Sequence, residues 1–313
     1  MKRLLSLMMK NRCFVCLDQA KFMSTERRIC MRRWISLVSA VLLMLGSSGL
    51  SIGESADEKP LGHLTKLGVE ESFLNEQIRN TSAFEDIPFS EYKFFDTLDS
   101  MILALDSGVI DGFITNEYTY EFLRSRNENR YSTFSTDPAH EYSFGFAMLL
   151  REEDSELCGR ISDVIAEMRA DGTMDELKDQ YIDRCIAGEE PAAVQPETFD
   201  QAGTLKVALT GDIPPMDYFS AEGLPVGFNT ALVSEVGRRL KMNIEFISVN
   251  SGARAASLAS RESDIVFWTE AANYYNWGEA DREDQPDLSV ITDIYLPAEI
   301  RLVVLKTFPG ADP

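Results

Sequence analysis

The sequence predicts an α/β fold of open mixed sheets with helices on both faces. The first observation behind this prediction is the stretch 204–249, which reads as a strand, a turn, a helix and a second strand. Its helix begins at Asn229, an N-cap residue type, and repeats Leu232, Val236 and Leu240 on one face at period 3.6. Apolar strands in this order are typical of an open parallel sheet.

The second observation is another α/β unit earlier in the chain. Apolar and polar patterning predicts strands at 67–69, 92–95 and 109–115, with helices at 71–78, 96–106 and 117–126. The spacing Leu105-x-Ser107-x-x-x-Asp111 returns as Leu258-x-Ser260-x-x-x-Asp264, each followed by an apolar run. Two such units predict two lobes of similar build, with chance similarity as the alternative.

Between the two units the sequence predicts one strand, two helices and a linker. The strand is expected at 143–150 after a polar loop at 127–140, and the first helix at 155–170. Thr173 and Glu176 form a capping-box pattern at the start of the second helix, which runs to about residue 182. Residues 188–203 are acidic, contain two prolines and lack periodicity, which indicates a linker.

The charge distribution excludes some partners. The 313 residues carry a net charge of −21, although residues 1–33 hold nine Lys or Arg against two acids. The remaining chain is strongly acidic, which argues against nucleic acid and against anionic membrane surfaces as partners. We expect a monomer with a well-hydrated surface.

The N-terminal region has the pattern of an export signal. Arg32 and Arg33 precede the apolar run 34–46, and the small residues Ser47, Ser48 and Gly49 follow it. This pattern predicts a secretory signal peptide, with a start at Met31 favoured over a long basic extension. An uncleaved signal anchor is the alternative, and no Cys follows the apolar run to serve as a lipid attachment site.

The cysteines divide into two groups. Cys13, Cys16 and Cys30 lie in or before the signal, so a metal or redox function is not expected from them. Cys158 and Cys185 fall near the start of one predicted helix and the end of the next. In an exported protein they form either a disulfide or two buried free thiols.

A family resemblance rests on several residues of the stretch 204–249. They are Pro214-Pro215, the turn at Gly223, the pair Gly227-Phe228 and the helix end Arg239-Leu240-Lys241 before a strand. Together they resemble the opening of bacterial extracellular solute-binding proteins of family 3, the two-lobed receptors of polar amino-acid ABC importers. The resemblance implies a two-lobed fold of the periplasmic-binding-protein type II.

The order of the parts is permuted relative to that family. Residues 64–187 resemble the second lobe with its return strand and closing helices, and residues 204–306 resemble the first lobe, ending in the crossover strand 300–306. Residues 188–203 are the linker, and residues 1–56 hold the N-terminal extension and the signal peptide. We interpret the chain as one circularly permuted receptor, which is feasible where termini lie at exposed positions.

The resemblance implies a ligand between the lobes, at loops beyond the carboxyl ends of the strands. The family holds an amino acid through an Arg after the first lobe's Asp-strand and an Asp at the end of the second lobe's strand. Here no Arg follows Trp268 until Arg282, and the neutral Asn116 stands where the Asp would fall, beside Glu117. The helix-opening turn of the second lobe is replaced by Glu70-Glu71-Ser72. Amino-acid recognition therefore departs from the family's pattern.

The candidate ligand-binding residues are those that these positions bring to the cleft. They are Asp212, Met216, Tyr218, Trp268, Thr269, Glu270 and Tyr275, with Tyr274 and Trp277 nearby and Asn116 and Glu117 opposite. Carboxylates with aromatic rings suit a cationic or ring-bearing ligand. The alternative is that Trp268 is a core residue and that the Tyr pair covers a lobe. Asp111 and Asp264 are expected to cap turns.

Three functions remain open. The first is an exported receptor that captures a small polar, amino-acid-like ligand for an ABC importer permease or a membrane sensor. The second is a degenerate binding module that contacts protein or cell-wall material. The third is an enzyme similar to the dehydratases of aromatic amino-acid precursors, with Glu270 or Glu117 as the acid. No phosphate loop, metal-ligand spacing or nucleophile–base pair occurs, so no cofactor, metal or catalytic residue is expected.

Overall fold

The computed structural model describes residues 64–70, 91–134, 143–272 and 286–312, and of residues 143–144 and 269–272 only the backbone. The predicted signal peptide and the predicted helix at 71–78 lie outside these residues.

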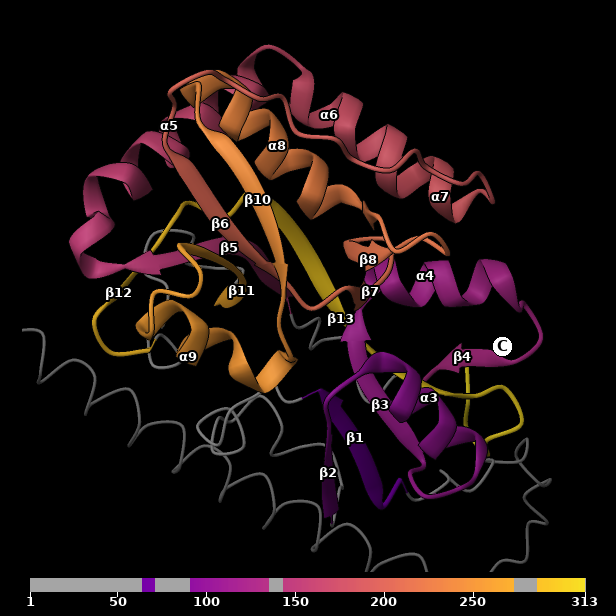
Figure 1. Cartoon of the computed structure of the whole chain (residues 1–313). Coiled ribbons are helices and arrows are strands. Elements are labelled where there is room, and N and C mark those ends of the chain that lie inside the picture. The colour runs from indigo at the N-terminus through magenta and orange to yellow at the C-terminus, as the bar shows by residue number, and fades with distance from the viewer. Residues whose placement is uncertain (1–63, 71–90, 135–142, 273–285, 313) are drawn as a thin grey trace, which may run out of the picture. The chain divides into compact units, whose positions relative to one another are not determined.

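A mixed β-sheet dominates the described part of the chain (Figure 1). Its strand order is β10 (Asn243–Ser248), β6 (Thr204–Leu209), β11 (Ile265–Ala272), β5 (Ser143–Arg151), β13 (Leu296–Leu305), β3 (Gly112–Asn116), β1 (Lys66–Glu70) and β2 (Glu91–Phe95). In addition, β12 (Ser289–Ile291) pairs with β5, and β4 (Tyr131–Thr133) pairs with β13. The predicted α/β class with a mixed sheet is confirmed.

Strand β13 divides this sheet into two sections. Its residues 296–299 pair with β5, and its residues 300–304 pair with β3, both antiparallel. We call β10, β6, β11, β5, β12 and the start of β13 the large section. The small section consists of β3, β1, β2, β4 and the end of β13. The predicted crossover strand is therefore longer than expected and runs from one section into the other (Figure 1).

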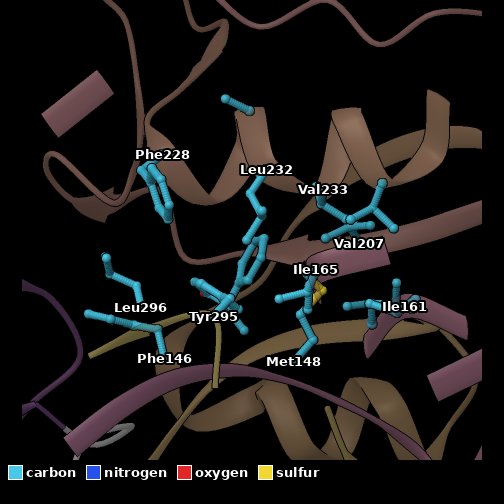
Figure 2. Packing of buried hydrophobic residues seen from close by; sticks show 14 of the residues in the cluster. Phe146, Met148, Ile161, Ile165, Val207, Phe228, Leu232, Val233, Tyr295 and Leu296 are labelled. Carbon is cyan, nitrogen blue, oxygen red and sulfur yellow. The ribbon is translucent and has the colours of Figure 1, made fainter. Parts of the chain in front are cut away.

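Helices cover both faces of the large section. Met148 and Leu150 of β5 pack in one core with α5 (Ser155–Ala170), α6 (Thr173–Lys178) and α8 (Phe228–Leu240). Figure 2 shows this core, where Leu232 and Tyr295 lie close to Met148 and Ile165. Leu149 points to the opposite face and packs with Leu258 of α9 (Arg254–Ala259), because successive strand residues alternate between faces.

The small section has a core of its own. Helix α3 (Leu98–Asp106) contributes Met101 and Leu105, and α4 (Glu117–Arg126) contributes Leu123. These side chains pack on Phe113 and Val303 of the sheet. Two separate cores joined through one strand are the arrangement expected of two lobes.

The internal echo seen in the sequence has a common geometry. Asp111 Oδ2 accepts hydrogen bonds from Thr65 N and Lys66 N at the start of β1. Asp264 Oδ2 accepts from Lys206 N near the start of β6, at 3.0 Å. In both units the Asp therefore ties the incoming turn to the neighbouring parallel strand, which confirms the expected turn-capping role.

Two helix starts differ from the sequence prediction. Helix α8 begins one residue earlier than expected, with Gly227 as its N-cap, so Asn229 lies inside the helix. Helix α6 has Gly172 as its N-cap, and Gly172 has no side chain to cap the helix. The predicted capping box does not form, because the Thr173 hydroxyl donates to Asp171 Oδ1, which also accepts from the Thr173 backbone N–H. In both places a glycine with positive φ allows the chain to enter the helix without a capping side chain.

The helix predicted from Thr173 to about residue 182 also ends differently from the prediction. After α6 the helix continues as a π-turn over Asp179–Asp183 and ends as α7 (Arg184–Ile186). The polar loop predicted at 127–140 contains the short strand β4. The circular permutation itself stays a prediction.

A small three-stranded sheet lies beside α8. It consists of β7 (Asp212–Ile213), β8 (Asp217–Phe219) and β9 (Pro225–Val226). Gly227 directly follows β9 and has a φ of 119°. A Cβ atom at this residue would lie 2.4 Å from the Met216 carbonyl oxygen. Only glycine fits this contact, which sets the position of β7 and β8 relative to α8.

Among the residues that the structure describes, no helix is both long and apolar enough to cross a membrane.

Candidate functional site

The carboxyl ends of the parallel strands in the two sections face each other. Strands β10, β6 and β11 run parallel, and so do β1, β2 and β3. Strand β11 runs in the direction of β13 because both are antiparallel to β5, whereas β3 is antiparallel to β13. The two sets therefore point toward the middle of β13 from opposite sides, and ligands of open α/β sheets bind at such ends.

Ionisable side chains gather at these ends, most of them buried. From the large section come Asp212 and Asp217 after β6 and Arg254 at the start of α9. From the small section comes Glu70, the last residue of β1. Glu70, Asp217 and Arg254 are all less than a tenth exposed. We call these four residues the charged cluster.

Asp217 is held by a chain of hydrogen bonds. Its Oδ1 accepts from Thr210 Oγ1 and from Gly211 N, each at 3.1 Å. Its Oδ2 accepts from Asn229 Nδ2 at 3.0 Å, and Tyr295 Oη donates to Asn229 Oδ1 at 2.8 Å. A buried carboxylate with three donors is well stabilised, so the network fixes the floor of the charged cluster.

Arg254 is the cation of the charged cluster. Its Nη1 donates to the Phe267 carbonyl at 2.7 Å, and its guanidinium lies 5.1 Å from the centre of the Trp268 ring. Burial lowers the pKa of Arg254, while the charges of Glu70, Asp217 and Asp212 act in the opposite direction. One buried guanidinium therefore stands among three carboxyl groups, an arrangement that suits a ligand with a positive group or with both charges.

Two side chains of the charged cluster connect the sections directly. Asp212 Oδ2 accepts from Leu98 N at 3.2 Å, at the start of α3. Glu70 Oε1 accepts from Ser251 Oγ at 2.7 Å, in the turn after β10. The pKa of Asp212 is raised, mainly because burial disfavours its charged form.

Among the predicted site residues, Asp212 and Trp268 lie in this region and Tyr218 lies beside it. The Tyr218 ring is 6.5 Å from Phe122 of α4, centre to centre, and its hydroxyl is 3.7 Å from Cys185 Sγ. Met216 is fully buried in the core of the large section, so it offers no exposed surface to a ligand.

Asn116 and Glu117 have local structural contacts. Asn116 is the N-cap of α4, where its Oδ1 accepts from Thr119 N and its Nδ2 donates to Thr119 Oγ1, both at 2.9 Å. Glu117 Oε1 accepts from Glu299 N at 3.2 Å, at the point where β13 changes section. Burial raises the pKa of Glu117.

The remaining predicted site residues fall in β11 and in the segment of sequence after it. Thr269 and Glu270 belong to β11, but their side chains lie outside the described part, and so do Tyr275, Tyr274 and Trp277.

Both cysteines of the pair considered for a disulfide are buried free thiols. This is the second of the two alternatives given by the sequence. Burial raises the pKa of Cys158, and it also raises that of Cys185, where the Tyr218 hydroxyl acts in the opposite direction. Neither thiol is therefore activated as a nucleophile.

Sequence reasoning missed four residues of this region: Asp217, Asn229, Arg254 and Tyr295. Arg254 precedes the Asp-strand rather than following it, so a search at the family's Arg position could not find it. Arg254 begins the helix RAASLA, in which every other residue is small or apolar. A charged residue in such a helix is expected to have a buried partner, and this signal could have identified Arg254.

Comparison with known proteins finds a family profile that matches part of the chain. The sequence profile of bacterial extracellular solute-binding proteins, family 3, matches residues 205–273, from β6 to the end of β11. No curated protein matches the chain.

Several solved structures are similar. The ligand-binding component of an ABC-type import system from Staphylococcus aureus, with zinc bound, is 11% identical at a TM-score of 0.35, and the match covers 79% of this chain and 66% of that protein. The GluR0 ligand-binding core from Nostoc punctiforme, in complex with L-glutamate, is 8% identical at a TM-score of 0.33, over 79% and 87% of the two chains. The periplasmic VFT2 domain of Bordetella pertussis BvgS is 15% identical at a TM-score of 0.35, over 78% and 82%.

Proposed function

We propose, from the family 3 solute-binding segment over residues 205–273, that the chain is an exported receptor for a small polar, amino-acid-like ligand. In this proposal the ligand lies between the two sections, and binding serves uptake through an ABC importer permease or signalling through a membrane sensor. The observation that carries the proposal is the charged cluster at the facing carboxyl ends of the strands.

The charges of the cluster match those of an amino acid. Arg254 supplies the cation that the family provides after its Asp-strand, so the ligand's carboxylate would pair with it. A ligand ammonium would pair with Asp212, Asp217 or Glu70. The carboxyl groups outnumber the guanidinium, so a ligand with an additional positive group is favoured over one with an additional negative group.

The experiment is a thermal-shift screen of the full chain against amino acids, polyamines, short peptides and aromatic acids. A ligand bound only by the folded state raises the melting temperature in a concentration-dependent way. We expect a saturable rise with one of the first two classes.

Arg254→Lys keeps the charge but loses the planar fork, so the shift should require at least about tenfold more ligand. Arg261→Lys, in the exposed turn after α9, is the matched control and should leave the shift unchanged. Equal shifts in both variants would exclude Arg254 from ligand binding.

A degenerate interaction module is the second candidate. The observation in its favour is that Asp212 and Glu70 already accept hydrogen bonds from the opposite section. A well-folded chain that shifts with none of the four classes would support this function and contradict the receptor proposal.

A further inference from the structure

The two sections are held together by hydrogen bonds that need no ligand. Asp212 of the large section accepts from the Leu98 backbone of the small section, and Glu70 of the small section accepts from Ser251 of the large section. We propose that the Asp212 carboxylate is a built-in latch, which occupies the N-terminus of α3 as a ligand anion would and keeps the sections closed without ligand.

At the N-terminus of α3, the first N–H group of the helix has its acceptor in the large section. A helix cannot satisfy the N–H groups of its own first turn. Here Thr97 Oγ1 accepts from Ser100 N, and the Thr97 carbonyl accepts from Met101 N. The Leu98 N–H, first in the helix, is directed instead to Asp212 Oδ2. The positive end of the helix dipole favours a negative charge at this point.

The large section holds Asp212 in place. Asp212 pairs with Tyr218 in the β7–β8 ladder. The preceding Gly211 has φ 75°, and its N–H donates to Asp217 in the buried network. The carboxylate is thus attached to the rigid part of one section while its donor belongs to the other. The bond forms only when the two sections are together, so it favours the closed arrangement.

The hydrogen bond between Asp212 and the Leu98 N–H changes how much energy a ligand must supply to close the two sections. A receptor that is open without ligand closes around its ligand, and the ligand supplies the closing energy. In this chain Asp212 supplies part of that energy, so the closed state is populated beforehand. The inference goes beyond the proposed function and needs only that the sections move relative to each other.

The test measures the distance between the sections in the full chain without any ligand. Fluorophores are attached through unnatural amino acids at Leu103 in α3 and at Glu262 after α9, both exposed, and single-molecule energy transfer gives the closed and open populations. In the parent chain we expect mostly the closed, high-transfer state. In Asp212→Ala we expect the closed-to-open ratio to fall about tenfold, the usual effect of losing a hydrogen bond to a charged group.

Asp99→Ala is the matched control. It removes a carboxylate from the first turn of the same helix, but Asp99 makes no bond to the large section among the described residues. The control should change the ratio less than about twofold, as is usual for a charge at a helix end. An unchanged distribution in Asp212→Ala, or equal opening in the control, would overturn the latch.

A second measurement covers the case in which Asp212→Ala does not fold. Asp212→Leu keeps about the size of the side chain but offers no acceptor to the Leu98 N–H, and hydrogen exchange then reports on single amides. The latch predicts faster exchange of the Leu98 amide, with exchange of the Met101 amide unchanged because its acceptor is the carbonyl of the N-cap Thr97. Unchanged exchange at Leu98 would refute the latch. Failure of the ligand screen alone would refute the receptor proposal and leave the latch standing.

Discussion

Replacing Tyr295 with Phe tests whether the buried network under the charged cluster stabilises the chain. Tyr295 is 1% exposed and packs between Phe146 and Phe228, with ring centres 6.3 and 6.2 Å away. The substitution keeps the ring and therefore the packing. It removes only the hydroxyl that donates to Asn229 Oδ1.

The expected loss of stability follows from the Asn229 oxygen, which has no hydrogen-bond donor once the Tyr295 hydroxyl is removed. Asn229 is 1% exposed, so water cannot replace the lost donor, and a buried acceptor without a partner costs about 1–3 kcal/mol. The same Asn229 donates to Asp217, so a shift of its amide would extend the loss toward the charged cluster. We expect the free energy of unfolding to fall by about 2 kcal/mol.

The assay is urea unfolding of the full chain followed by circular dichroism at neutral pH. Tyr181→Phe is the control, because Tyr181 is also buried but its hydroxyl bonds none of the described residues. The control should change the free energy by less than about 0.5 kcal/mol. A Tyr295→Phe chain as stable as the control would refute the network as a source of stability.

Three further predictions concern two glycines, Glu117 and the charged cluster. Gly227→Ala should destabilise the chain by about 2 kcal/mol or more, because Gly227 has a positive φ and no room for a Cβ atom. Gly159 lies in α5, and a Cβ atom there would have no neighbour within 4 Å, so Gly159→Ala should stabilise the chain by about 1 kcal/mol in the same urea assay. Glu117 has a raised pKa in the folded chain, so its folded form binds a proton more readily than the unfolded chain does. The parent chain should therefore gain stability relative to Glu117→Gln as the pH falls from 7 toward 4, with Glu299, Arg301 and Lys178 as the charges facing Glu117; a pH-independent difference would contradict this. Arg254→Met should cost about 3–5 kcal/mol at neutral pH because it removes the buried positive charge that stands among three carboxyl groups. Arg261→Met, which is exposed, should cost less than about 1 kcal/mol.

Periodicity and turn chemistry were sufficient to predict most elements. The strands β6 and β10 and the helices α4 and α5 occur where their apolar spacing predicts them, because their apolar residues pack in the cores. The echo between Asp111 and Asp264 was readable because the same turn needs the same acceptor. Helix starts were less predictable, since a glycine with positive φ can replace a capping side chain.

The candidate site was only partly predictable from the sequence. Asp212 is predictable because it follows β6, and Trp268 because it lies in the apolar run that forms β11. The sequence predicts Asn229 as a helix cap because Asn commonly serves that role, yet its amide links Tyr295 to Asp217 across 66 and 12 positions of the chain. Such contacts depend on which face of a helix packs against which turn, and the local sequence pattern does not determine this packing.

The central claim is that a ligand binds where the carboxyl ends of the two sections face each other. Its most direct test is hydrogen–deuterium exchange of the full chain, with and without the compound that gives the largest thermal shift. The claim predicts slower exchange in peptides covering 66–70, 97–99, 210–218 and 250–254, with no change in α5 at 155–170. Protection confined to other parts of the chain would contradict it.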